Sequence, residues 1–319
     1  MKRGIGISII ILIVSLLYWG QDKPEKLLKD QPTAQKVKEK QEGKKQPSRR
    51  ASGSLSIENK DQLVQPLVGK EVSKNGKEPT YETAPDLRAN ELSKRNLLEY
   101  EMKKDMAVAF GDIMLGEIVG GAKAKKGVAK AHPIELWPSS EIPFGIEKGF
   151  PNPDRVMQAI DYFRENTPME FVPLDGHQDG IIFVKGEEHC YSYVGKIGGV
   201  QPITLSDKCG PWAILHEIMH ALGFIHEQNR NDRDRFVEIH WDNIEIDAKK
   251  YFSKAPESWM DPMKGSRFDF NSVMLYHPSV FAKSNEVQTM TSIEGWPIDP
   301  VTDGLSQSDL DRVHYLYGR

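Results

Sequence analysis

The chain has 319 residues, of which 39% are hydrophobic and 28% charged, and its formal net charge is −4. This length allows more than one domain, and the hydrophobic residues are numerous enough for a folded core. A net charge this close to zero gives no reason to expect a nucleic-acid partner.

Residues 1–20 combine a basic start with an apolar run. Met1-Lys2-Arg3 is followed by residues 4–19, which contain no acidic side chain. This pattern is typical of a secretory signal peptide. The run is short for a bilayer span and no small-x-small cleavage site follows it, so the alternative is an uncleaved anchor that holds residues 4–19 in a membrane. Both interpretations predict an exported protein, either secreted or attached to the cell envelope, whereas a buried helix is the purely structural alternative.

Residues 21–84 have the composition of a tether. No aromatic residue occurs in residues 21–80, and residues 22–50 carry ten basic and five acidic side chains among Gln, Pro and Ser. Such a segment has too little apolar surface to fold, so we expect a disordered linker. Binding of its basic side chains to an anionic surface or a nucleic acid is the alternative, and we favour the solvated linker.

Apolar residues return in residues 85–126. Four of them lie at roughly helical spacing: Leu92, Leu97, Leu98 and Met102. This spacing predicts a helix. Gly111 and Asp112 follow, two residue types that are common in turns. Residues 123–127 read Lys-Ala-Lys-Lys-Gly, a flexible basic stretch that a trypsin-like protease would cut, unless it is an uncleaved linker between domains.

Two regular elements are readable in the first part of residues 127–319. Residues 156–163 predict an amphipathic helix with Val156, Ile160 and Phe163 on its buried side. Residues 180–184 form an apolar run after a glycine, which predicts a buried strand. Helices and strands in one segment of this length predict an α+β fold with a single core.

A histidine-rich motif lies between His216 and His226. His216 and His220 are four residues apart, so on a helix they lie on one face and reach the same ion. Pro211 suits the first position of a helix, which would therefore begin about one turn before His216. Gly223 is able to adopt a left-handed conformation that ends the helix and turns the chain, so that His226 completes the coordination.

Three neutral imidazoles around one ion predict a catalytic Zn²⁺ site. Structural zinc usually has four protein ligands, whereas three nitrogens at about 2.0–2.1 Å leave one position open for a reacting molecule. Zinc lowers the pKa of a bound water to roughly 7 and polarises a carbonyl group. Glu217 lies beside the ligands, where it would take the proton of the water and pass it to the leaving amine. The motif therefore predicts a hydrolase, and a metalloprotease in particular.

Other interpretations fit parts of this pattern. Core histidines without a metal are disfavoured, because three His, one Glu and one Gly rarely meet at these offsets by chance. A binding module that holds zinc without catalysis would have no use for Glu217. A hydrolase of non-peptide amides would need a closed pocket for a small molecule in place of an open cleft. A non-haem iron enzyme normally has a carboxylate in its facial triad.

Segments on both sides of the motif carry a family pattern. They are residues 190–195, 205–209, 228–235, 272–276 and 305–317. Together with the pattern HExxHxxGxxHE, these segments resemble the astacin family of zinc metalloendopeptidases, a group of metzincins, over about residues 132–319. The resemblance implies a two-lobed α+β catalytic domain in residues 127–319. A twisted N-terminal sheet would lie above the cleft, the zinc helix would form its back wall, and the C-terminal lobe would be rich in loops.

The resemblance assigns roles to residues near the motif. It implies that Met274 lies as an apolar floor under the zinc, and that Tyr276 supplies a phenolic oxygen, either as a fifth zinc ligand or as a donor to the oxyanion. It implies that Glu227 receives the mature amino terminus in a buried, water-linked contact, the alternative being a carboxylate in solvent. A protein or peptide substrate would pair as an extended strand near residues 191–194.

The resemblance also implies a latent precursor, with residues 85–126 as an inhibitory propeptide. The family's latent form uses an F-x-G-D segment whose aspartate takes the open zinc position. Asp112 fits this role, although Phe110 stands one place late and Ala109 takes its position. The alternative for Asp112 is a plain turn. Activation would require a trypsin-like protease, and the mature chain would begin between residues 124 and 132.

The two cysteines of the chain are Cys190 and Cys209. In an exported protein they would form a disulfide, which adds roughly 3 kcal/mol of stability in the chain-entropy model. Two free thiols are the alternative. Pro168 and Gly318 stand where many relatives have the cysteines of a second disulfide.

Residues 230–235 form a cluster of charged side chains. Acidic and basic residues alternate in this cluster, an arrangement that favours local ion pairs over binding to phosphates. We therefore expect a structural cluster and no nucleic-acid site.

Overall fold

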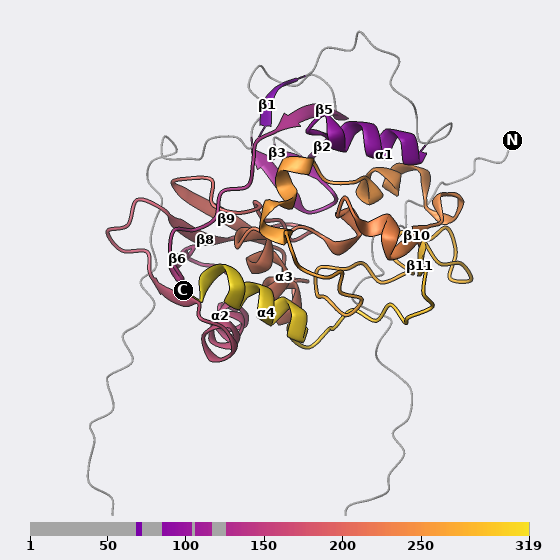
Figure 1. The fold of residues 1–319 in the computed structure, drawn as a ribbon. Helices are drawn as coiled ribbons and strands as arrows, with labels where there is room; N and C mark the ends of the chain where they lie inside the picture. The colour runs from indigo at the N-terminus through magenta and orange to yellow at the C-terminus, as the bar shows by residue number, and fades with distance from the viewer. Residues whose placement is uncertain (1–67, 72–84, 104–105, 117–125, 319) are drawn as a thin grey trace, which may run out of the picture. The chain divides into compact units, whose positions relative to one another are not determined.

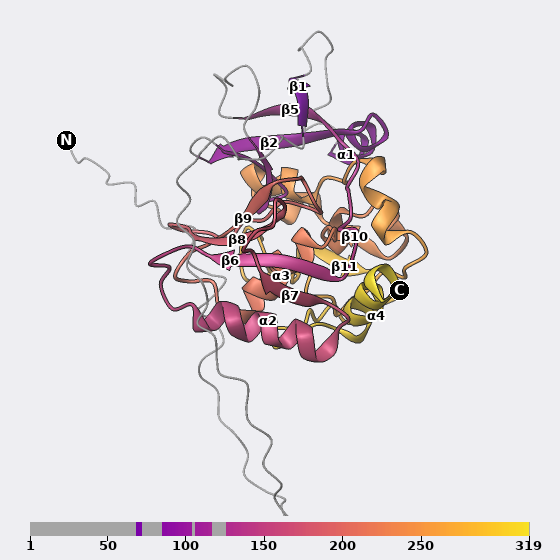
Figure 2. The ribbon, with the colours of Figure 1, turned by 90° about the vertical axis from the view of Figure 1, so that its left-hand side faces the viewer.

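The computed structural model describes residues 68–71, 85–103, 106–116 and 126–318. All of them belong to the compact unit of residues 52–319 (Figures 1 and 2). The predicted signal or anchor, residues 1–20, lies outside the described residues. Within the predicted tether, Val68–Glu71 forms strand β1, so the expectation of a disordered linker is wrong at this point. No helix in the described part of the chain is long and apolar enough to cross a membrane.

A four-stranded parallel sheet forms the centre of the N-terminal lobe. Its order is β7-β6-β8-β9, and its strands are Glu170–Pro173, Glu141–Ile146, Gly180–Lys185 and Val200–Leu205. Strand β8 lies inside the sheet and has four successive buried residues at its start. Strands of a parallel sheet are covered on both faces, so continuous apolar runs are expected there. The predicted buried strand is confirmed.

Two helices pack together in the core beside this sheet. Helix α2 is Asp154–Asn166 and buries Val156, Ile160 and Phe163, as the sequence predicts. Helix α3 is Pro211–Ala221 and carries the histidine motif. Its carboxyl end is held by the indole of Trp137, which donates a hydrogen bond of 2.9 Å to the carbonyl of Ala221.

A second sheet is built mostly from the residues that precede the N-terminal lobe. Helix α1, Pro85–Lys94, separates the first strand of this sheet from the other four in the sequence. The sheet has the order β1-β5-β2-β3-β4, and its other strands are Leu97–Lys103 for β2, Met106–Ala109 for β3, Ile113–Gly116 for β4 and Lys126–Ala131 for β5. All its pairs are antiparallel.

The helical prediction for Leu97, Leu98 and Met102 is wrong, because these residues form strand β2. Asn96 has a left-handed φ of 52°, which ends the preceding helix. The strand then pairs with β5 and β3, partners that lie farther along the chain. A local apolar spacing does not reveal such pairing.

The predicted flexible stretch at residues 123–127 is ordered at its end. Lys126 and Gly127 begin β5, between β1 and β2, so the expectation of flexibility is wrong for these two residues. A Cβ atom on Gly127 would lie 2.6 Å from the hydroxyl oxygen of Tyr100, which explains the glycine at this position. Residues 123–125 lie outside the described residues. Strand β5 spans the boundary that the sequence predicts between propeptide and catalytic domain.

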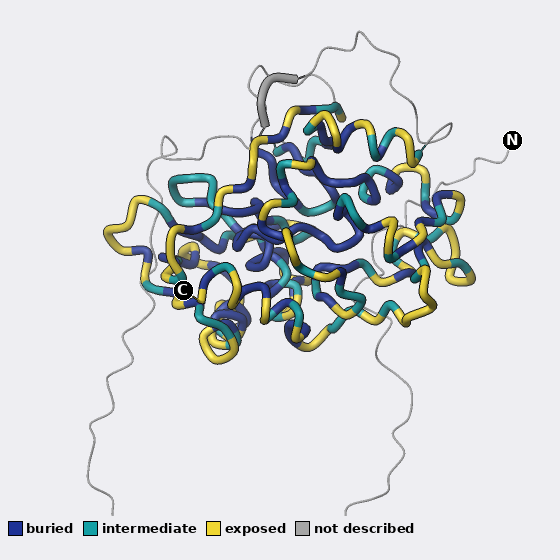
Figure 3. Tube along the Cα trace, viewed as in Figure 1, coloured by how far each residue is buried: buried dark blue, intermediate teal, exposed yellow. Residues whose placement is uncertain are grey.

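The C-terminal lobe is rich in loops, as expected. It contains the short 3-10 helices Glu227–Asn229, Arg233–Arg235, Trp241–Asn243, Ile246–Phe252 and Glu257–Met263. Strands β10, Val237–Ile239, and β11, Met290–Ser292, form an antiparallel pair. Helix α4, Gln307–Tyr317, follows a capping box made by Ser306 and Asp309. Figure 3 shows buried stretches running through the interior and exposed residues concentrated in the peripheral loops.

Cys190 and Cys209 form a disulfide, as predicted. It closes the segment between strand β8 and helix α3, and Cys209 directly precedes the Gly210 cap of that helix. The disulfide therefore fixes the chain immediately before the histidine motif.

Candidate functional site

The geometry of the motif follows from its two ends. Helix α3 begins at Pro211, one residue after its cap Gly210, and ends at Ala221. Gly223 then has a φ of 103°, and a Cβ atom there would lie 2.6 Å from Leu136. Glycine alone satisfies both constraints. The resulting turn returns the chain so that His226 faces the helix, as the sequence predicts.

Four side chains from three parts of the chain converge on one point. Asp112, His216, His220 and His226 each offer a ligand atom, and these atoms all lie within 4.8 Å of one another. The Nε2 atoms of the three histidines lie 3.4, 3.5 and 3.2 Å from the Asp112 carboxylate. A tetrahedral zinc ion with ligands at about 2.0–2.1 Å separates them by about 3.3–3.4 Å. The spacing of the cluster fits such an ion.

Hydrogen bonds fix the protonation of the ring nitrogens. His216 Nδ1 lies 2.9 Å from the carbonyl of Val273, and His220 Nδ1 lies 2.8 Å from the carbonyl of Phe224. A carbonyl only accepts, so each Nδ1 carries a proton, and each Nε2 is left to face the centre of the cluster, where a metal ion would bind it. Among the described residues, His220 Nε2 has no hydrogen-bond partner. The donor set is therefore suited to a cation.

Asn229 orients the third histidine, a role that the sequence analysis missed. Its Oδ1 accepts a hydrogen bond of 3.1 Å from His226 Nδ1. Its Nδ2 donates to the carbonyls of Tyr251 and Ser253, which fixes the orientation of the amide. His226 Nε2 consequently faces His216 Nε2 at 3.2 Å. An Asn three residues after the last histidine was the available signal.

Burial and neighbouring groups shift the pKa values of residues in and beside the cluster. Burial alone would raise the pKa of Asp112, but the three histidines hold it well below its usual value, so the carboxylate is ionised. Burial lowers the pKa of His220 to about 4, which keeps the ring neutral. Burial raises the pKa of Glu217 well above its usual value, and the Asp112 carboxylate raises it further. Glu217 Oε2 is buried without a hydrogen-bond partner in the described part of the chain.

Tyr276 lies beside the cluster, but its hydroxyl is bound elsewhere. Its ring centroid is 5.0 Å from that of His226. The hydroxyl donates a hydrogen bond of 2.7 Å to the carbonyl of Phe110, in the predicted propeptide. The next residue, Gly111, has a φ of 100°, and a Cβ atom there would lie 3.0 Å from the same hydroxyl. The roles predicted for Tyr276 stay predictions.

The turn that contains Met274 supports the site through its backbone. The carbonyl of Val273 accepts from His216, and the carbonyl of Met274 accepts a hydrogen bond of 2.9 Å from the Glu227 nitrogen. Met274 itself is buried in the main core. Its position as a floor under the metal stays a prediction.

Glu227 is fully buried, so the alternative of a carboxylate in solvent is wrong. Its carboxylate accepts hydrogen bonds from Arg312, Arg230 and the backbone nitrogen of Asp269. Burial raises its pKa and the two arginines oppose this rise. Arg312, which lies 85 residues away in sequence, had no local signal.

The predicted substrate edge is occupied by the chain's own residues. Met114 donates a backbone hydrogen bond of 2.7 Å to Ser192, and Ser192 donates one of 3.1 Å to Asp112. The two segments run parallel, and Tyr191 joins strand β9 on the other side. The segment that brings Asp112 to the histidines therefore pairs with Ser192.

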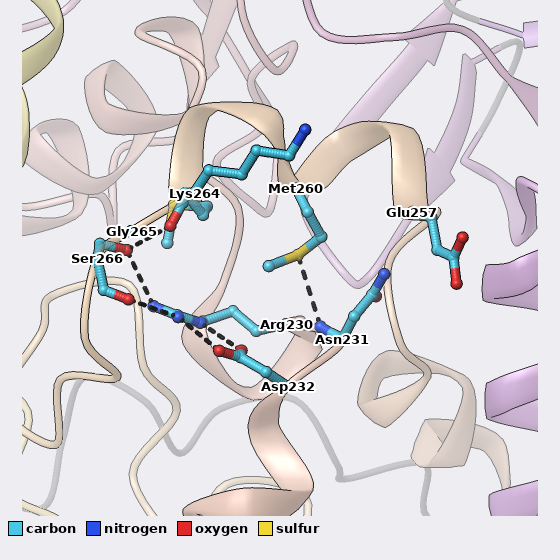
Figure 4. Close-up of a pocket in the computed structure, with 9 residues that line it drawn as sticks. Arg230, Asn231, Asp232, Glu257, Met260, Lys264, Gly265 and Ser266 are labelled. Carbon is cyan, nitrogen blue, oxygen red and sulfur yellow. Dashed lines mark hydrogen bonds and ion pairs between the residues drawn. The ribbon is translucent and has the colours of Figure 1, made fainter.

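Two of the three arginines in residues 230–235 form the local ion pairs that the sequence predicts, whereas Arg235 is exposed. Arg230 pairs with Asp232 at 2.9 Å and Arg233 pairs with Asp234 at 3.1 Å. Both arginine side chains are 1% exposed, so they are not available to a polyanion. A pocket of about 390 Å³ lies beside Arg230 on the outer side of this cluster (Figure 4).

Comparison with known proteins agrees with this geometry. The profile of the peptidase family described as Astacin matches residues 129–318. Zinc metalloproteinase nas-13 of Caenorhabditis elegans is 35% identical over 184 residues, which are 57% of this chain and 40% of that protein. Zinc metalloproteinase nas-14 of the same organism is 37% identical over 197 residues, covering 58% of this chain and 38% of that protein. The chain thus spans about two fifths of these curated relatives.

One solved structure is similar in fold and sequence. It is high choriolytic enzyme 1, a hatching enzyme zinc-protease from the medaka fish Oryzias latipes, with a TM-score of 0.51 and 28% identity. The similarity covers 59% of this chain and 99% of that one. Three of the four clustered residues, the histidines, lie within the residues that match the family profile, and Asp112 precedes them. The chain belongs to the astacin family of zinc metallopeptidases.

Proposed function

We propose that the chain is a zinc-dependent endopeptidase that hydrolyses peptide bonds of proteins and is made as a latent precursor. One observation carries the proposal: three histidines direct their Nε2 atoms at one point beside a buried glutamate. His216, His220 and His226 would hold the zinc ion. Zinc, when bound, lowers the pKa of a coordinated water and polarises the substrate carbonyl.

The chain's own residues would do the remaining chemistry. Glu217 accepts the proton of the attacking water and passes it to the leaving amine. Tyr276, once it leaves the carbonyl of Phe110, donates its hydroxyl to the oxyanion or ligates the metal. An extended substrate would take the place that residues 112–114 occupy against Ser192.

Latency would come from Asp112. Its carboxylate stands at the position that a reacting molecule needs, 3.2–3.5 Å from all three histidines. Residues 85–126 would form the propeptide and residues 127–319 the catalytic domain. A trypsin-like protease cutting within residues 123–127 would release the inhibition, and the mature chain would begin between residues 124 and 132.

We further infer that the protein is exported. The disulfide between Cys190 and Cys209 is typical of an oxidising compartment. Residues 1–20 would serve as a signal peptide, or residues 4–19 as a membrane anchor. The substrates would be proteins or peptides outside the cytosol.

The test is protein hydrolysis by the full chain before and after trypsin treatment. Glu217→Ala, prepared in the same way and checked for bound zinc, is the matched control. Casein hydrolysis that appears after cutting, is abolished by a chelator and is absent in the variant supports the proposal. If zinc-loaded parent and variant are both inactive on casein and on a mixture of other proteins, a zinc-binding module without catalysis replaces the endopeptidase.

A further inference from the structure

The last helix reaches the zinc motif through a hydrogen bond of 2.8 Å from Tyr317 to the carbonyl of Leu222, and through a buried ion pair at the end of the motif. Arg312 Nη1, on α4, donates to Glu227 Oε1 at 2.5 Å. The Glu227 side chain is 0% exposed and that of Arg312 is 6% exposed. A buried carboxylate without a counter-charge is strongly destabilising. Arg312 supplies such a charge.

Arg230, the other arginine near Glu227, is committed mainly to different partners. Figure 4 shows its guanidinium between the Asp232 carboxylate and Ser266. It forms two hydrogen bonds with Asp232, at 2.9 and 3.0 Å, and lies 3.4 Å from Glu227. Arg312 also donates to the carbonyl of Arg267 and lies 3.7 Å from Asp309, but Glu227 is its closest charged partner, and it is the closer of the two cations to Glu227.

Glu227 in turn is connected to two of the zinc-ligand histidines. It directly follows His226, and its backbone nitrogen donates to the carbonyl of Met274. The neighbouring carbonyl of Val273 accepts from His216 Nδ1. A displacement of Glu227 would therefore move His226, which directly precedes it, and the turn whose Val273 carbonyl orients His216.

We propose that Arg312 is a positioning residue of the zinc site, and that it provides within the intact chain the positive charge that Glu227 would otherwise receive from a new amino terminus. The ion pair is closed while residues 126–131, which lie within the range proposed for the mature terminus, form β5, drawn near the top of Figure 1 with α4 near the bottom. The zinc site is then complete before cleavage, and catalysis tolerates different mature amino termini. The expected tolerance of different mature amino termini rests on the proposed endopeptidase activity.

The first experiment measures zinc retention by the full chain against a competing chelator. Arg312→Gln should weaken retention by about 10- to 100-fold, the usual range for a group that supports a metal ligand from outside. Arg312→Lys should recover part of this loss because it keeps the charge. Glu227→Gln combined with Arg312→Gln should also retain more zinc than Arg312→Gln alone, because the buried charge of Glu227 is then no longer left without Arg312. The last two variants separate charge pairing from general damage to the fold.

Arg155→Gln is the matched control. Arg155 is also 6% exposed, but it donates to the backbone carbonyls of Ser206 and Cys209 and not to Glu227. We expect a lower melting temperature with zinc retention close to that of the parent. Retention in Arg312→Gln equal to that of the parent, or an equal loss in Arg155→Gln, would overturn the proposal.

The second experiment varies the mature amino terminus. Full chains that keep only Lys123, Lys125 or Lys126 in the basic stretch, with the other two changed to Gln, are cut with trypsin and their termini read by mass spectrometry. The hydrolysis rates per bound zinc should agree within about twofold, well below the tenfold that 1.4 kcal/mol represents. Activity confined to one terminus would overturn the proposal. If no form cuts proteins, the endopeptidase proposal fails, and the zinc series alone decides the role of Arg312.

Discussion

The hydroxyl of Tyr276 donates a hydrogen bond of 2.7 Å to the backbone carbonyl of Phe110. The residue proposed to stabilise the oxyanion is thus held by the segment proposed to block the zinc. Asp112, two residues after Phe110, meets the histidines through the same turn. One short segment consequently engages both the proposed metal ligands and the tyrosine proposed to act in catalysis.

Removal of the Tyr276 hydroxyl should reduce catalysis and leave metal binding intact. In activated Tyr276→Phe, kcat should fall by about 10²–10³, the usual cost of losing one oxyanion donor. Casein hydrolysis and zinc analysis measure the two effects. Tyr251→Phe is the control, since that hydroxyl donates to Glu101. An unchanged kcat in Tyr276→Phe would remove the tyrosine from the mechanism.

Asp112→Asn should make the uncut chain partly active. The amide keeps the shape of the side chain but loses the charge that the three histidines stabilise. Hydrolysis of casein before trypsin treatment is the measurement. Asp86→Asn is the control, because Asp86 contacts Trp241 from the same segment and lies away from the cluster. If the uncut Asp112→Asn protein hydrolyses casein no faster than the uncut parent, a blocking role of Asp112 is contradicted.

Asn229→Ala should weaken zinc binding by about 10- to 100-fold, because the ring of His226 loses the acceptor that fixes its tautomer. Competition with a chromogenic chelator measures this change. Asn243→Ala removes a similar side chain whose amide donates to Gln288 at an exposed position, and it should retain zinc normally. A parent-like affinity in Asn229→Ala would mean that packing alone orients His226.

Acidification should loosen the docking of β2 on the C-terminal lobe. Burial tends to raise the pKa of Glu101, but Tyr251, Lys103 and Lys250 lower it below the ordinary value of 4.5. The undocked state therefore binds more protons at low pH, and the contribution of Glu101 is present above about pH 4.5 and lost as the pH falls through the lowered pKa. Hydrogen exchange of residues 97–103 at about pH 6.5 and about pH 4 measures the change. Glu101→Gln should flatten this dependence, and an equally steep dependence in that variant would assign it to another group.

Removing the disulfide should lower the free energy of unfolding by about 3 kcal/mol, the chain-entropy value for a loop of this size. The double variant Cys190→Ser with Cys209→Ser, unfolded in urea beside the parent, measures the loss. A loss well under about 1 kcal/mol would show that packing holds the segment before α3 without the cross-link.

Local features of the site could be predicted from the sequence. Helix α3 with His216 and His220, and the return of the chain to His226, follow from spacings of four and six residues, and Gly223 supplies the turn after the helix. The sequence also indicated Asp112, although Phe110 stands one place late. In the structure Phe110 has a left-handed φ of 53°, followed by Gly111 at 100°. These two residues place the carboxylate at the histidines.

Features that depend on distant pairing could not be predicted. The apolar residues of β2 have a helical spacing, which gives no indication that β2 pairs with β5, a strand that follows β3 and β4 in the sequence. The backbone carbonyl of Val273 orients His216. Every residue type has such a carbonyl, so the sequence does not reveal this contact. Arg312 and Glu227 are separated by 85 residues, and only the fold brings them together.

Strand β5 is hydrogen bonded to residues on the other side of the proposed cut. Residues 97–101 pair with residues 126–130 in an unbroken register, so hydrolysis before Lys126 leaves this ladder in place. The nicked protein is then a two-chain complex, and departure of the inhibitory chain is a separate step that obeys mass action. Enzyme activity would lag behind the nick, rise on dilution, and stay suppressed wherever both chains remain confined together.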